Sequence, residues 1–131
     1  MNRIESVNQV EVLDIPARIA QLSLLRDGWH DGEGLAPHQD GLRWLASAWK
    51  LQWPASAPLP RLFPTLAGGV QAEWTMAPLS ISIEIDLTRK RATLLALNSQ
   101  SGSIALDETI DLASDAGWKI IARCVNSDLA D

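Results

Sequence analysis

The clearest pattern in the chain is the alternation of apolar and polar residues between positions 70 and 87. Apolar residues occupy every second position from Val70 to Met76 and again from Leu79 to Leu87. Because successive side chains of a strand point to opposite faces, the two runs predict two strands with one dry and one wet face. Ala77-Pro78 lies between them and predicts a turn.

Weaker patterns flank these two strands. The segment Leu59–Thr65 predicts a first strand, and Pro64 within it indicates an edge or a bulge. Arg91 to Leu97 is expected to return beside the second alternating run, and Ser103 to Leu106 to form a short last strand. We therefore expect an antiparallel meander of three to four strands.

Helical spacing of apolar residues comes before and after the strands. Asp14 is a suitable N-cap for a first helix that runs to about Arg26. A second helix is expected from Pro37 to about Trp53. A final helix, capped by Asp111 or Ser114, would present the apolar side chains Trp118, Ile121, Ala122 and Val125.

This order of elements predicts an α+β fold with two N-terminal helices, the meander, and a C-terminal helix packed on one sheet face. The helices should cover the face that carries Trp74 and Ile83. A length of 131 residues fits one domain, 1–131. Residues 1–13 form either a short strand or an irregular arm, and 127–131 a frayed tail.

The charge of the chain narrows the classes of partner. It carries 16 acidic residues against 11 lysines and arginines, a net charge of −5. This excess of acid argues against nucleic acid, whose phosphates require clustered basic residues. It favours a basic protein partner, which an acidic surface attracts.

The cysteine count and the hydropathy of the chain indicate the cellular compartment in which the protein is expected. Cys124 is the one cysteine, so neither an intramolecular disulfide nor a multi-cysteine metal site can form, and a buried, inert thiol is expected. No apolar run is long enough to span a membrane, and the start MNRIESVNQVEVLD does not resemble a signal peptide. We expect a cytoplasmic protein that binds no membrane.

The densest polar segment is DGWHDGEG at residues 27–34, and it raises the question of a metal site. It offers the candidate ligands Asp27, His30, Asp31 and Glu33. A calcium loop that started at Asp27 would need a carboxylate or amide at its third position and glutamate at its twelfth, where Trp29 and His38 stand. The two histidines also lack a standard zinc spacing. We therefore expect no metal and no cofactor, and keep a metal-dependent hydrolase built on residues 27–38 as the alternative.

A structural role for this loop accounts better for its composition. Gly28, Gly32 and Gly34 can adopt positive φ, which a sharp connection between two helices requires. Trp29 is expected to bury its ring as a plug between the helices. The exposed polar side chains would then be available to a partner.

The wet face of the predicted sheet is the second candidate site. If Met76 pairs near Leu79, Gln71 lies opposite Glu84, and Glu73 becomes a diagonal neighbour of Glu84. Two such carboxylates could form an acid–base pair, but the solvent side of a sheet carries this polar pattern in almost every α+β protein. Between the two functional interpretations, we favour a face for a partner protein over catalysis. The expected partner-binding residues are His30, Asp31, Glu33, Gln71, Glu73 and Glu84.

Two sequence motifs resemble a family of small uncharacterised bacterial proteins. They are GWHDGEGLAP at 28–37, and the segment from Pro60 to Pro64 followed by GGVQAEW at 68–74. The family pattern is roughly GWDGxGAxP, a proline-rich link, and PxxxPTxxGGxxxEW. This chain departs from it at His30, an extra residue, and at Leu35. The resemblance carries no activity; it implies that the loop and the strand with Trp74 belong to one structural unit, in which Trp29 and Trp74 meet in the core.

No catalytic constellation emerges, because the serines lack a G-x-S-x-G elbow and only two histidines are present. Our leading hypothesis is a non-enzymatic, acidic protein-binding module with an antitoxin-like or immunity-like role. A homodimer stays open as an alternative. A regulatory subunit that binds a small ligand beneath the helices is a third possibility.

Overall fold

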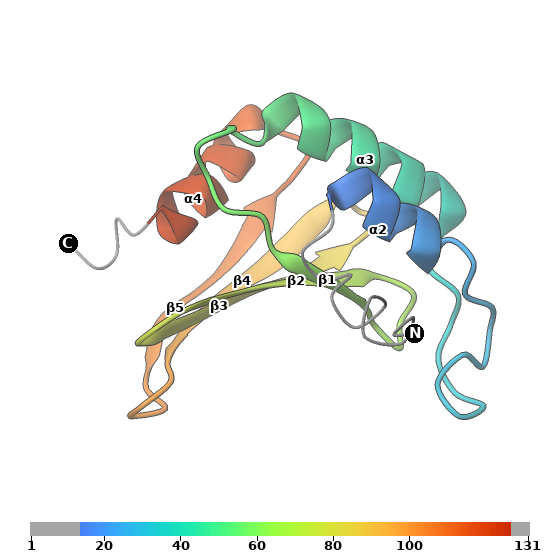
Figure 1. The fold of residues 1–131 in the computed structure, drawn as a ribbon, viewed down its shortest axis with the longest axis horizontal. Coiled ribbons are helices and arrows are strands. Elements are labelled where there is room, and N and C mark those ends of the chain that lie inside the picture. Colours follow the sequence, from blue (N-terminus) through green and yellow to red (C-terminus); the bar gives the residue numbers. More distant parts are fainter. Residues whose placement is uncertain (1–13, 127–131) are drawn as a thin grey trace, which may run out of the picture.

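The computed structural model of the chain describes residues 14–126 and shows a two-layer α+β architecture (Figure 1). Two helices come first, α2 (Ile15–Leu22) and α3 (Gln39–Gln52), and α4 (Asp115–Val125) follows the sheet. The strands are β1 (Arg61–Pro64), β2 (Val70–Met76), β3 (Leu79–Asp86), β4 (Arg91–Asn98) and β5 (Ile104–Asp111). The expected arm 1–13 and tail 127–131 lie outside the described residues.

The strands form one antiparallel sheet in chain order, β1-β2-β3-β4-β5. The predicted register of β2 and β3 is confirmed, since Met76 pairs with Leu79 and Gln71 with Glu84. Alternate residues of β2, β3 and β4 are buried beneath the helices, as the period of two predicted. We call this side the inner face and the opposite side the outer face.

The prediction of three to four strands was wrong, because the described sheet has five. Both weakly predicted segments at the edges of the sheet form strands, β1 and β5. β5 also continues to Asp111 instead of ending near Leu106. Most of its side chains are exposed, Glu108 among them. Hydrogen bonds between strands join backbone groups, so a polar segment can pair along an edge without an alternating apolar pattern.

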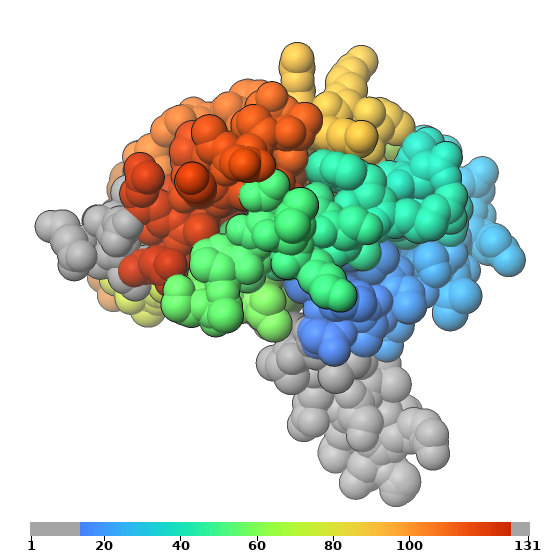
Figure 2. Space-filling model, turned by 90° about the horizontal axis from the view of Figure 1, so that it is seen from above, coloured from blue at the N-terminus to red at the C-terminus, as the bar shows by residue number. Residues whose placement is uncertain are grey.

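The three described helices cover the inner face of the sheet (Figure 1), and seen from above their atoms form one continuous surface (Figure 2). α2 ends at Leu22 rather than near Arg26. Beyond it, the N–H groups of Leu24 and Leu25 donate to carbonyls three residues back, at 3.1 and 3.2 Å, so the α-helical pattern of bonds to the fourth residue back does not continue. Ser114, and not Asp111, caps α4. None of the helices within residues 14–126 is long and apolar enough to cross a membrane.

Four tryptophans form the centre of the core where α3, β2 and α4 meet. The Trp49 ring lies 5.1 Å from that of Trp118 at 85° and 6.4 Å from that of Trp74 at 19°, centroid to centroid. Trp53, at the end of α3, lies 5.7 Å from Trp74. Trp49, Trp74 and Trp118 are buried and Trp53 is half-buried. Burying about 150–250 Å² of each of the three buried rings at about 25 cal/mol per Å² gives an upper estimate of roughly 4–6 kcal/mol apiece. This cluster joins two helices to the sheet.

Hydrogen bonds orient two of these rings. The indole N–H of Trp74 donates to the Pro58 carbonyl at 3.0 Å, and that of Trp118 to the Leu112 carbonyl at 2.9 Å. A buried indole usually finds such a partner. The bond to Pro58 also fixes the connector between α3 and β1 against the core.

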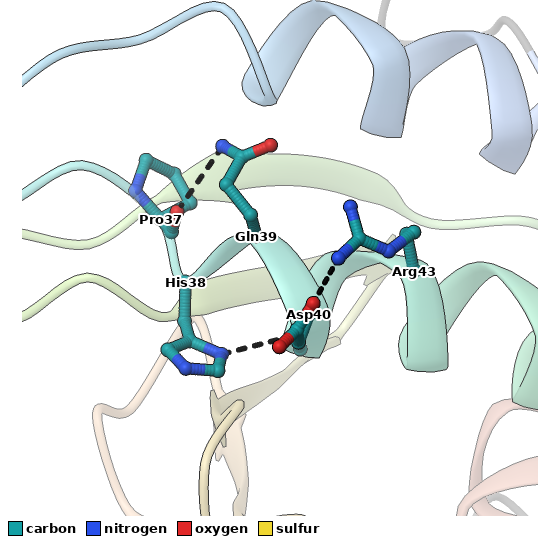
Figure 3. A network of polar contacts seen from close by, with 6 residues as sticks. Pro37, His38, Gln39, Asp40 and Arg43 are labelled. Carbon is teal, nitrogen blue, oxygen red and sulfur yellow. Dashed lines mark hydrogen bonds and ion pairs between the residues drawn. The ribbon is translucent and has the colours of Figure 1, made fainter.

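His38 caps the N-terminus of α3, a role that its residue type did not indicate. Its Nδ1 accepts the N–H of Gly41 at 2.9 Å. Figure 3 shows the imidazole beside the first turn, where Asp40 pairs with Arg43. A Cβ at Gly41 would lie 2.5 Å from the Cβ of Leu87, so a glycine lets the helix start directly on the sheet.

The cap yields a test. We expect His38→Leu to lower the free energy of unfolding by about 1 kcal/mol, because the Gly41 N–H loses its acceptor. His38→Asn, whose side-chain oxygen can accept the same N–H, should stay close to the unsubstituted protein. Urea unfolding measures both, and equal stability of the leucine and asparagine variants would contradict the capping role.

Candidate functional site

The segment DGWHDGEG folds as a miniature hairpin. His30 and Glu33 exchange backbone hydrogen bonds of 2.8 and 2.9 Å, and the Gly28 N–H donates to the Gly34 carbonyl at 2.7 Å. Asp31 and Gly32 form the tip with φ of 53° and 91°, and positive φ at both central residues is the mark of a type I′ turn. The predicted positive φ is confirmed at all three glycines, which have φ of 86°, 91° and 94°.

Trp29 does not plug the space between the helices, and that prediction was wrong. Its half-buried ring folds back on its own loop, where the indole N–H donates to the Leu35 carbonyl at 2.9 Å. The ring lies against Gly34 and makes an edge contact with His30, with centroids 5.5 Å apart. Trp74 instead packs in the four-tryptophan cluster, so the expected contact of Trp29 with Trp74 is not formed.

The loop is attached to the turn between β1 and β2. The Leu35 N–H donates to the Leu66 carbonyl at 2.9 Å, and the His38 N–H to the Gly68 carbonyl at 3.2 Å. Asp27 fixes the base of the loop by accepting the Ala36 N–H at 2.8 Å. The two sequence motifs, far apart in the chain, therefore meet through backbone hydrogen bonds at this point.

The polar side chains at the loop tip remain in solvent. His30, Asp31 and Glu33 are exposed. Within residues 14–126, no three His, Cys, Asp or Glu side chains come together in a group that could hold a metal ion. The loop holds these polar side chains on a hydrogen-bonded turn, but they do not converge on one position where an ion could bind.

The outer face of the sheet brings the other predicted residues together. Gln71 lies between Glu73 on its own strand and Glu84 on β3, and its amide donates to the Glu73 carboxylate at 2.6 Å. Glu84 is exposed. No hydrogen bond or ion pair in the described part of the chain joins this group to the loop tip, so the six predicted residues form two separate groups.

The outer face also carries apolar side chains that the sequence pattern did not single out. Leu97 lies directly between Ser80 and Ile104, and Leu95 between Ser82 and Asp107. Ile104 is 63% exposed. Because β4 reads RATLLALN, apolar residues occupy both of its alternate phases. The half-buried leucines of the outer face, Leu95 and Leu97, could therefore be recognised only from their pairing with Ser82 and Ser80.

A groove of about 680 Å³ lies between the loop base and the outer face. Ala36 and His38 line it from the loop side, Gly68 from the β1–β2 turn, and Glu84 and Thr93 from the sheet. Because residues of both regions line the groove, the loop base and the outer face are neighbouring parts of one surface. No described helix or strand lies on this side of the sheet (Figure 1).

Asp86 closes the turn between β3 and β4 at the rim of this groove. One carboxylate oxygen accepts the N–H groups of Arg89 and Thr88, both at 3.1 Å, and the Thr88 hydroxyl at 2.8 Å. The bonds from the Arg89 N–H and the Thr88 hydroxyl hold the pKa of Asp86 below its ordinary value of 3.8. The carboxylate therefore stays charged and orders the turn.

Comparison of the chain with protein-family models, with curated proteins and with solved structures finds no match. Its function must be inferred from its own residues.

Two glycines of the loop form a matched pair for a test. Gly32 and Gly34 have nearly equal φ, but a Cβ at Gly32 would meet nothing within 4 Å, whereas one at Gly34 would lie 2.9 Å from Trp29 Nε1. We expect Gly32→Ala to cost about 1 kcal/mol, from the backbone alone, and Gly34→Ala to cost more. Chemical denaturation measures both, and equal losses would show that Trp29 is not held against Gly34.

Asp86 predicts a dependence of stability on pH. Because its folded pKa is lowered, its contribution is complete above about 3.8 and is lost as the pH falls through the lower folded value. Asp86→Asn should therefore be less stable than the unsubstituted protein at pH 7, and the difference should shrink below pH 3.8. Urea unfolding over this range measures it; a difference that does not change with pH would contradict the assignment.

Proposed function

We propose that this protein is a non-enzymatic binding module for another protein, and that the outer face of the sheet is its contact surface. The observation that carries the proposal is the one-sided packing of the sheet. α2, α3 and α4 all lie on the inner face, and no element of residues 14–126 covers the outer one. A broad face with half-buried apolar residues beside carboxylates is typical of a surface that a partner covers.

The charge of the outer face supports a basic partner. Five carboxylates lie on it against two arginines: Glu73, Glu84, Asp86, Asp107 and Asp111, with Arg61 and Arg91. Both arginines pair in register with acids, Arg61 with Glu73 and Arg91 with Asp86 and Asp111. The remaining negative potential attracts a basic protein and speeds its association. An acidic module that covers a basic partner in the cytoplasm suits an antitoxin-like or immunity-like role.

The loop tip would extend this surface. His30, Asp31 and Glu33 stand on a turn that is fixed by its own hydrogen bonds and by its attachment to the β1–β2 turn. Side chains held on such a rigid base lose little freedom on binding. They form a second, smaller contact region beyond the groove.

The experiment is co-purification of the tagged protein from the organism that makes it. We expect a stoichiometric protein partner and at least a tenfold loss of affinity for the triple variant Gln71→Ala, Glu73→Ala, Glu84→Ala. The matched control is Gln39→Ala, Asp40→Ala, Asp115→Ala, which likewise removes one amide and two carboxylates, from exposed positions of the helical layer. The unfolding midpoint of each variant confirms that it is folded.

Absence of any stoichiometric partner would count against a binding module. Unchanged affinity of the first triple variant, or an equal loss in both variants, would show that the outer face is not the contact surface.

A further inference from the structure

We propose that the outer face has an apolar anchor, the cluster of Leu95, Leu97 and Ile104, that receives the apolar stripe of an amphipathic, basic helix. The inference rests on the proposed function and deepens it by naming the chemistry of the partner segment. None of the three anchor residues belongs to the polar groups considered above.

The register of the strands gathers the anchor. Leu95 and Leu97 are successive outward residues of β4, and Ile104 pairs with Leu97 from β5. The shift of register between Ala96 and Leu97 brings Ile104 to the outer face. The leucines are half-buried and Ile104 is 63% exposed. Three branched apolar side chains thus form one continuous patch.

The residues on β3 leave this patch accessible from one side. Ser80 and Ser82 lie directly beside Leu97 and Leu95. A serine side chain is too short to cover the flank of a leucine. A partner side chain can therefore pack against the flanks of both leucines and onto the serines between β2 and β4.

Carboxylates border the apolar patch. Asp107 lies beside Leu95 on one side, and Glu73 lies beyond Ser82 on the other. An apolar centre with a negatively charged border is complementary to a segment whose leucine-like residues are flanked by lysine or arginine. A helix with an apolar stripe and basic flanks presents this pattern, with its apolar residues spaced at three and four positions.

The same charges argue against a second copy of the chain on this face. Two copies placed face to face would bring Glu73, Glu84 and Asp107 against another acidic set. Juxtaposed like charges disfavour association. Charge complementarity therefore selects a basic partner over self-association.

Anchor and border should have different roles in binding. Apolar burial scales with the area removed from water and holds the complex together, so loss of the anchor should raise the dissociation rate. Exposed charges at the border contribute little to affinity but guide the encounter, so their loss should lower the association rate and its dependence on salt.

The test uses an 18-residue amphipathic helical peptide of leucine and lysine as the probe, and a matched peptide in which serine replaces leucine. Binding kinetics are measured by surface plasmon resonance at two salt concentrations. We expect Leu97→Ser and Ile104→Ser each to weaken binding at least tenfold through faster dissociation. Asp107→Asn, which removes a charge from the border, should mainly slow association and reduce its salt dependence. Leu51→Ser is the control, since Leu51 is 81% exposed on α3, and it should bind like the unsubstituted protein.

Three results would overturn the proposal. They are equal binding of the leucine-free peptide, unchanged binding by Leu97→Ser, and a homodimer in sedimentation that Leu97→Ser dissociates. Failure here is distinguishable from failure of the proposed function. Suppose that a native partner is found, that only the triple variant at Gln71, Glu73 and Glu84 loses it, and that the peptide does not bind. This result would reject the amphipathic helix as the partner segment and leave the proposed binding module standing. Peptide binding that depends on Leu97, without any native protein partner, would support the apolar anchor and reject the proposed function.

Discussion

Four tryptophans packed against one another hold the helical layer and the sheet together. Trp49 and Trp53 come from α3 and its end, Trp74 from β2, and Trp118 from α4. Each ring is large enough to contact elements from both layers, so the cluster joins the helices before and after the sheet to the same strand. Since all this apolar area lies on one side, the sheet has a single dry face.

One-sided packing determines what the opposite face can do. The outer residues of the strands are held in fixed rows by the sheet, yet no described element covers them. The loop at 27–34 is similarly rigid, because Asp31 and Gly32 close a tight turn and Leu35 and His38 bond to the neighbouring β1–β2 turn. The molecule therefore presents exposed carboxylates and apolar side chains on a preorganised base, which lowers the entropic cost of binding another molecule.

The sequence predicted those features that depend on local periodicity or on glycine. Alternation from Val70 to Leu87, with its short turn, was sufficient for the register of β2 and β3. The sequence indicated a short last strand at Ser103–Leu106 but not its continuation to Asp111, because pairing along an edge requires only backbone groups. It also did not show which leucines of β4 face outward, since both alternate phases of that strand contain apolar residues. The ring of Trp29 folds back onto Leu35, and His38 caps a helix; both depend on contacts that residue type does not specify.

We propose that a protein partner contacts the outer face of the sheet and not the helical layer. Site-specific photocrosslinking in the native cell tests it most directly, with a photoreactive amino acid at Ser82 on the outer face or at Ser47, exposed on α3. We expect one discrete crosslinked protein from position 82 and none from position 47. A discrete product from position 47, with none from position 82, would contradict it.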